Sequence, residues 1–194
     1  MKKILLALLL AIAAVTGTFA QKSVQFGVKA GANVSTFKEY GAKMRPGFYA
    51  GGYADFRINK SLHLQPELLY STYGQTRSIP YAFYNNTKVQ SHFVHLPVMI
   101  KYYPVARLYL EAGPQFGYNF TTTVKDEPTG KRNIAPADKF HLGVNVGVGY
   151  YLGNGFSATL RHTWGIVPSR GFYTGGSMNN VVQAGISYSF SSPK

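Results

Sequence analysis

Charged side chains recur at one parity of the residue numbers. Asp55, Glu67 and Glu111 are carboxylates, and paired carboxylates can exchange protons in general acid–base catalysis. Basic residues accompany them, however, and residues of one parity share a face of a β-strand. Charges gathered on an enclosed face are tolerated when they pair with one another, so we expect a lumenal ion-pair network and no catalytic residue. Its members are Lys29, Asp55, Arg57, Glu67, Lys101, Glu111 and Arg161, and Arg107 has the same odd parity.

Metal and thiol chemistry have little support in the sequence. The histidines, which are His63, His92, His95, His141 and His162, follow none of the spacings typical of metal ligands. Those at 63, 95 and 141 have inward parity, and we expect them to be hydrogen-bonded inside the fold. The chain has no cysteine, which excludes a thiolate site, a disulfide framework and a cysteine nucleophile. We therefore predict no cofactor and no metal site.

Strands must position these side chains, because apolar and polar residues alternate with period two from Val24 onward. Most of the segments are nine to fourteen residues long, enough for a tilted strand to cross a membrane. Their apolar residues have even numbers, so the two faces are in different solvents. We expect eight strands, at Val24–Asn33, Gly47–Ile58, Leu62–Tyr73, His92–Tyr103, Arg107–Phe120, Phe140–Leu152, Phe156–Trp164 and Asn180–Phe190.

The even face favours a membrane environment. Its aromatic residues gather near strand ends, as headgroup interfaces select, whereas the odd face is rich in glycine and suits a crowded lumen. We expect two aromatic girdles, with Phe48, Tyr70, Tyr118 and Trp164 at one rim and Tyr102, Tyr150 and Tyr188 at the other.

Short and long connections alternate along the chain. The turns at 59–61, 104–106 and 153–154 are short, whereas Val34–Pro46, Gly74–Ser91, Thr121–Lys139 and Gly165–Asn179 are long. This alternation predicts an all-β fold, an eight-stranded antiparallel up-and-down transmembrane β-barrel with four long extracellular loops and short periplasmic turns. Side chains alone fill so narrow a barrel, so we expect a plugged polar lumen.

Residues 1–20 have the pattern of a secretory signal peptide. Lys2 and Lys3 precede the apolar run Ile4–Val15, and the small residues Thr18 and Ala20 precede Gln21. We therefore divide the chain into a signal peptide, 1–20, and a barrel domain, 21–194.

Removal of the signal peptide lowers the net charge from +13 to +11. With so many aromatic residues and so few charges, this excess does not indicate nucleic acid, and basic loops suit the phosphates of lipopolysaccharide.

The last strand contains a sequence pattern with regularly placed polar, glycine and aromatic residues. Gln183, Gly185, Tyr188 and Phe190 follow the order polar-x-Gly-x-x-aromatic-x-aromatic. This order resembles the signal by which the barrel-assembly machinery recognises its substrates, so that machinery is an expected partner during biogenesis.

Four segments resemble the PorT-like outer-membrane barrel family of the Bacteroidota. They are Phe26–Asn33, Leu64–Ser71, Leu96–Tyr103 and Tyr109–Tyr118. Prolines inside strands remove ladder donors, and the resemblance implies that Pro66, Pro97 and Pro114 are tolerated. It implies an outer-membrane barrel of a Gram-negative bacterium and assigns no particular activity.

The leading hypothesis is an integral outer-membrane protein, monomeric, with both termini in the periplasm. It would act in membrane integrity or bind an external or secretion-system partner through its loops, in contact with outer-membrane lipid and lipopolysaccharide. One alternative is an exported lipocalin-type binder of small molecules. Another is a lipid-modifying barrel enzyme that uses His162, although Trp164 stands where some eight-stranded lipases have a serine two residues after the histidine.

Overall fold

The computed structural model describes residues 24–37, 42–77, 87–126, 130–134, 136, 139–167 and 179–190, so residues 1–20 lie outside the described residues. Among these there is no helix long and apolar enough to cross a membrane. The described chain forms nine antiparallel strands: β1 (Val24–Phe37), β2 (Ala42–Arg57), β3 (Leu62–Arg77), β4 (Thr87–Val105), β5 (Leu108–Asp126), β6 (Gly130–Ile134), β7 (Phe140–Gly153), β8 (Phe156–Gly165) and β9 (Asn179–Ser189).

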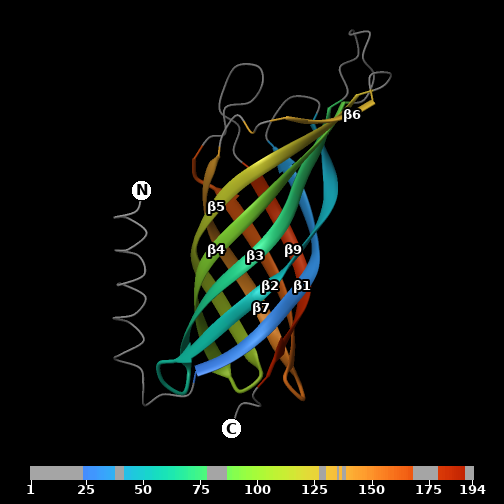
Figure 1. Cartoon of the computed structure of the whole chain (residues 1–194). Coiled ribbons are helices and arrows are strands. Elements are labelled where there is room, and N and C mark those ends of the chain that lie inside the picture. The colour runs from blue at the N-terminus through green and yellow to red at the C-terminus, as the bar shows by residue number, and fades with distance from the viewer. Residues whose placement is uncertain are drawn as a thin grey trace.

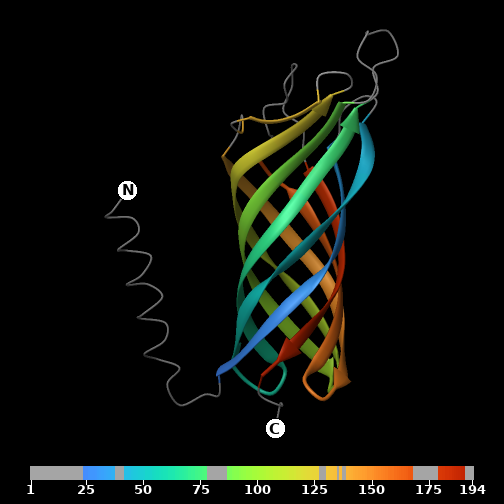
Figure 2. The same ribbon diagram turned by 45° about the vertical axis from the view of Figure 1, so that its right-hand side comes forward.

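Eight of these strands close into a barrel. The sheet order is β4-β3-β2-β1-β9-β8-β7-β5, and pairing of β4 with β5 completes the ring. The strands cross the long axis of the barrel obliquely (Figures 1 and 2). Strand β6 lies outside the ring, where it pairs with the end of β5. The predicted eight-stranded antiparallel barrel is confirmed, with a ninth strand that the periodicity did not indicate.

The two ends of the barrel differ. At the turn end, short connections join β2 to β3, β4 to β5 and β7 to β8. The first and last described strands also meet there, since the Phe190 amide donates to the Phe26 carbonyl at 2.9 Å. At the opposite, loop end, β2, β3, β4 and β5 run several residues farther than the sequence predicts. These extensions contain few apolar residues, so alternation does not reveal them, whereas threonine-rich stretches such as Thr121–Thr123 still favour strands.

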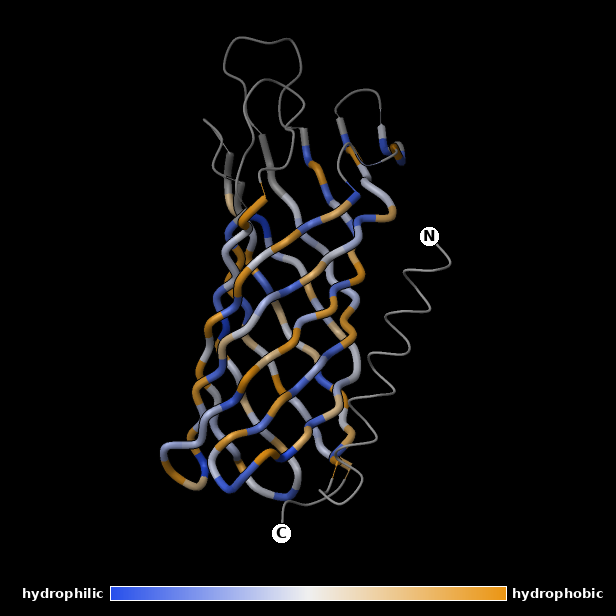
Figure 3. The backbone as a smooth tube through the Cα atoms, turned by 90° about the vertical axis from the view of Figure 1, so that its left-hand side faces the viewer, coloured by the Kyte–Doolittle hydropathy of each residue, from blue (hydrophilic) through white to orange (hydrophobic). Residues whose placement is uncertain are grey.

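Apolar residues cover the outside of the barrel. Apart from Val105 and Val167, the exposed large hydrophobic residues of the described chain have even numbers, and Figure 3 shows the resulting alternation along the strands. One bulge reverses the parity. The β4–β5 pairing shifts between His92 and Phe93, after which Thr122 and Val124 are buried. Even residues of β5 therefore face outward up to Phe120, where the predicted strand ends, and inward in the extension beyond it.

Each of the three strand prolines interrupts the ladder with the preceding strand. At Pro66 the β2–β3 partners jump from Tyr53–Glu67 to Phe56–Leu64, and corresponding gaps occur in β3–β4 at Pro97 and in β4–β5 at Pro114. On its other side each proline keeps a cross-strand partner. The register is the same before and after each gap. Each missing N–H donor therefore interrupts the strand pairing locally and does not shift any strand.

Candidate functional site

Four charged side chains meet inside the barrel. Arg161 donates from Nη1 and Nη2 to the two carboxylate oxygens of Glu67, at 2.9 and 2.8 Å, and from Nε to Glu111 Oε1 at 2.7 Å. Lys29 Nζ donates to Glu67 Oε1 at 2.9 Å, and Gln65 adds an amide donor at 2.7 Å. The charged side chains are at most 3% exposed where they pair. We call Lys29, Glu67, Glu111 and Arg161 the charge cluster.

The charge cluster spans the barrel because of the strands that supply it. Lys29 lies on β1, Glu67 on β3, Glu111 on β5 and Arg161 on β8, which are alternate strands of the ring. Strands β3 and β8 are four positions apart in a ring of eight, so the Arg161–Glu67 pair bridges opposite walls. One level of the lumen is thus occupied from four sides by mutually paired charges.

A glycine makes room for the Glu111–Arg161 contact. Glu111, Gly147 and Arg161 are successive cross-strand partners on β5, β7 and β8. A Cβ atom at position 147 would lie 2.9 Å from Glu111 Oε1. The glutamate side chain therefore needs a neighbour without a side chain in order to reach across β7, which is a requirement that parity alone does not reveal.

The remaining charges of the predicted network do not join the cluster. Lys101 is buried with its ammonium 4.2 Å from the Tyr109 ring centroid, a cation–π contact. Asp55 binds His63, with Oδ1 2.6 Å from Nδ1. Arg57 is partly exposed near the turn end, opposite His63. Arg107, which the sequence places in a strand, lies instead in the exposed turn before β5.

Aromatic side chains fill much of the remaining lumen, which the sequence reading missed. Tyr73 and Tyr109 are among the largest fully buried side chains. Tyr109 donates or accepts a hydrogen bond with Thr159 at 2.7 Å and lies directly against Gly149. Pairing of large rings with glycines on neighbouring strands is the signal that could have identified this layer, but it requires the register.

His95 and His141 lie in an aromatic layer toward the loop end. Their ring centroids are 6.0 Å apart, and His95 stacks on Phe93 at 5.0 Å. Their ring nitrogens have no hydrogen-bond partner among the described residues, so the expectation that they are hydrogen-bonded is wrong there. No group of three or more His, Asp or Glu residues in the described chain could hold a metal ion.

Aromatic residues on the outer surface lie toward the two rims. Near the loop end, Tyr70 bonds His92 through its hydroxyl at 2.7 Å and packs on Phe48 and Phe120. The other predicted girdle residues, Tyr102, Tyr118, Tyr150, Trp164 and Tyr188, are 38–51% exposed.

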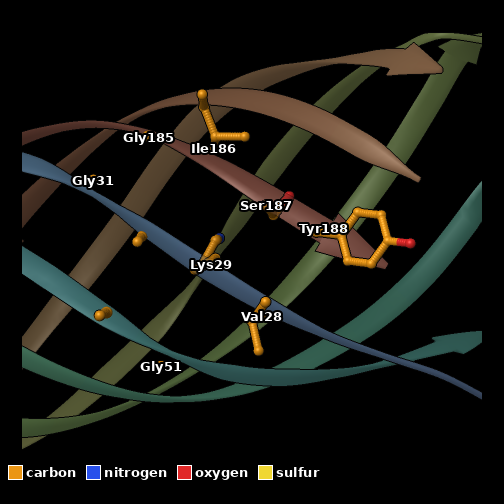
Figure 4. A pocket seen from close by; sticks show the side chains of 10 residues that line it. Val28, Lys29, Gly31, Gly51, Gly185, Ile186, Ser187 and Tyr188 are labelled. Atoms are coloured by element: carbon orange, nitrogen blue, oxygen red, sulfur yellow. The ribbon is translucent and has the colours of Figure 1, made fainter. Parts of the chain in front are cut away.

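The first and last strands meet at a seam with a shallow apolar groove. Val28 on β1 and Ile186 and Tyr188 on β9 line this groove (Figure 4).

Of the predicted assembly residues, Gln183 is buried in the lumen and Gly185 lies against Tyr49. Tyr188 and Phe190 are exposed on the outer surface, where Tyr188 packs on Phe156 with ring centroids 4.8 Å apart.

His162 lies on the outer surface of β8 and packs against Trp164 in a tilted arrangement, with ring centroids 4.3 Å apart. Thr163 is buried on the opposite face and donates to Asn145 Oδ1 at 2.6 Å. The nearest hydroxyl in the sequence therefore faces away from the imidazole.

Known proteins share this architecture. No curated protein sequence matches the chain. Among solved structures, Neisserial surface protein A (NspA) aligns with a TM-score of 0.62 and 16% identity, over 87% of this chain and 100% of NspA. Ail of Yersinia pestis, in complex with the heparin analogue sucrose octasulfate, aligns with a TM-score of 0.52 and 12% identity, over 87% and 99%. At these identities the likeness shows the fold alone.

Membership follows from a family model. The model described as "Outer membrane protein beta-barrel domain" matches residues 19–170, which is most of the chain and includes all four members of the charge cluster. The chain therefore belongs to the outer membrane protein beta-barrel domain family and is an outer-membrane protein.

Proposed function

We propose that the protein is an integral, non-conducting barrel with a structural or interaction role at the cell surface. Residues 1–20 direct export, both chain ends lie in the periplasm, and the loop end faces outside. Its partners are outer-membrane lipid and lipopolysaccharide, the barrel-assembly machinery during biogenesis, and a protein bound at the loops. Family membership removes the lipocalin-type alternative, and the separation of His162 from Thr163 argues against the lipid-modifying one.

The observation that carries this proposal is the charge cluster. Its four side chains come from alternate strands and form ion pairs across the lumen. An ion passing this level would have to displace a buried pair, and separating such a pair leaves a desolvated charge that costs about 3–5 kcal/mol. The cluster thus favours a closed lumen and leaves function to the outer surface and the loop end.

Three further observations support the finer parts of the proposal. The described chain ends meet at the turn end, which short turns place in the periplasm in outer-membrane barrels. The prolines interrupt the ladder without shifting the register, as the PorT-like resemblance implies. Ail, which has the same fold, was solved with a sulfated ligand, and a surface that binds anions is compatible with the basic loop end of this chain.

Planar-bilayer recording tests the closed lumen. Purified protein folded into lipid vesicles and fused with the bilayer should produce no current steps above those of empty vesicles. Arg161→Ala, which removes the central cation, should produce intermittent steps if it folds, and protection from protease in vesicles verifies folding. Regular conductance steps from the unaltered protein would overturn the proposal.

A further inference from the structure

We infer that Lys88, Lys125 and Lys131 form a binding row for the phosphates of an outer-leaflet glycolipid. This inference rests on the proposed orientation, with the loop end outside the cell. The proposed function includes contact with lipopolysaccharide, and this inference assigns that contact to three lysines and to the phosphate groups.

The row is a product of strand pairing. Lys88 on β4 is the cross-strand partner of Lys125 on β5, and Lys125 is the partner of Lys131 on β6. All three side chains are exposed. Neighbouring strands are about 4.8 Å apart, so the three lysines lie side by side on three adjacent strands, although Lys88 is far from the other two in sequence.

Such a row needs an anion. Like charges placed directly opposite in a sheet destabilise it, and none of the three lysines has an ion-pair partner among the described residues. The ammonium group is a strongly hydrated point charge with three donors on a flexible stem, which suits the several oxygens of a phosphate. Repulsion within the row is relieved when a phosphate lies between neighbouring ammonium groups.

The row lies on the outer face of the barrel. Along β4, Phe93 and His95 are buried in the lumen, so the alternate positions His92, Gln90 and Lys88 face outward. Beyond the β5 bulge, Lys125 shares the face of Lys88. The lysines therefore face the surroundings of the barrel and do not face the lumen.

The surface between the apolar wall and the row changes from aromatic to polar to basic residues, as is typical of a membrane interface. His92 belongs to the aromatic belt with Tyr70 and Phe120. Above it, Thr123 donates to Asn133 at 2.8 Å in an exposed polar row, followed by the lysines. Lys88 is four positions from His92 along β4, which is about 13 Å along the strand and roughly 10 Å in height at a tilt of about 40°. Flexible lysine stems at this height reach the phosphorylated sugars of a glycolipid whose acyl chains contact the apolar wall.

Binding of diphosphoryl lipid A in detergent micelles tests the inference. The row variant is Lys88→Gln/Lys125→Gln/Lys131→Gln, and the control is Lys60→Gln/Arg107→Gln, which removes positive charge from exposed positions at the turn end. Each lysine near an anionic surface contributes roughly fivefold in affinity, so the row variant should bind about 100-fold more weakly. The control should bind within about threefold of the unaltered protein. Dephosphorylated lipid should bind all three proteins equally weakly.

Several outcomes would overturn the inference. One is equal loss of affinity in the row and control variants, and another is undiminished binding of dephosphorylated lipid. Stronger row-dependent binding of sucrose octasulfate than of lipid A would assign the row to a soluble sulfated glycan. Failure of the proposed function is separately visible: conductance would refute the closed lumen, and periplasmic labelling of the loop end would refute the orientation, while micelle binding by the row persisted.

Discussion

Arg161 is the residue on which the interior depends most. It neutralises Glu67 and Glu111 together, and both carboxylates are almost fully buried. A buried ion pair is a weak source of stability compared with apolar packing, but removal of one partner leaves an uncompensated charge. The damage from losing Arg161 should therefore exceed any stability that the pairs themselves contribute.

We predict that Arg161→Gln lowers the free energy of unfolding by about 3–5 kcal/mol, the usual cost of breaking a buried pair. Urea titration of the protein in lipid vesicles, followed by tryptophan fluorescence, measures this change. Arg107→Gln, in an exposed turn, makes the same chemical change and should alter the value by less than about 0.5 kcal/mol. Equal effects of the two substitutions would contradict the assignment of Arg161 to a buried cluster.

The ring of Tyr109 packs directly on a glycine of a neighbouring strand. Gly149 faces the Tyr109 ring directly, whereas a Cβ at Gly52 would meet only the Gly27 carbonyl oxygen at 3.6 Å. Gly149→Ala should destabilise the barrel by about 1–3 kcal/mol through overpacking, and Gly52→Ala should be nearly neutral. The same urea titration compares them, and a neutral Gly149→Ala would show that Tyr109 has space to move.

Parity in the sequence identified the side chains that face the lumen but not their partners. Lys29, Glu67, Glu111 and Arg161 are all predictable as inward-facing, because odd parity persists within each strand. That Arg161 reaches Glu67 rather than Asp55 depends on the relative heights of opposite strands. These heights are set by pairing across the whole ring, which single-strand periodicity does not contain.

At the scale of elements, the prolines divide the barrel wall into two kinds of seam. The pairings β2–β3, β3–β4 and β4–β5 each contain a gap, whereas β8–β9 is continuous from Phe156–Tyr188 to Trp164–Asn180. In each gap the proline has no N–H, so the carbonyl opposite it, of Ala54, Glu67 or Val98, has no ladder donor. Local opening should therefore be easier on the proline side of the barrel.

Hydrogen exchange checks this difference. In the folded protein, we predict that the Ala54, Glu67 and Val98 amides, which lie opposite the prolines in the gaps, exchange at least tenfold faster than those of Leu160 and Arg161 at mid-height of β8. Comparison at similar depth within the barrel removes the effect of fraying at the ends. Uniform protection around the ring would mean that the missing proline donors do not make these pairings easier to open.

Strand lengths show where prediction from the sequence fails at this scale. Within the apolar band, the start and end of β7 and β8 were predicted to within one residue, since lipid and lumen impose a strong contrast between faces. Above the band, few apolar residues distinguish the two faces of the strands, and the alternation in the sequence is weak. The extensions of β3, β4 and β5, and the whole of β6, fall in that region.

At the scale of the molecule, the two ends of the closed barrel differ in the segments and charged residues that they present. Both described chain ends and the short turns are at the turn end, whereas the lysine row and the extended hairpins are at the loop end. An apolar wall with closed pairing leaves no unpaired edge in lipid. The direction in which this asymmetric body is inserted therefore decides which surface meets the outside of the cell.

Cysteine labelling decides the direction, because the natural chain has no cysteine. We predict that Lys139→Cys, at the loop end, reacts with a membrane-impermeant maleimide in intact cells. Lys60→Cys, exposed in the turn between β2 and β3, should react only after the outer membrane is permeabilised. The two substitutions change the same residue type at opposite ends, and labelling after denaturation corrects for expression. Reaction of Lys60→Cys alone in intact cells would invert the barrel, and the lysine row would then face the periplasm, away from any outer-leaflet glycolipid.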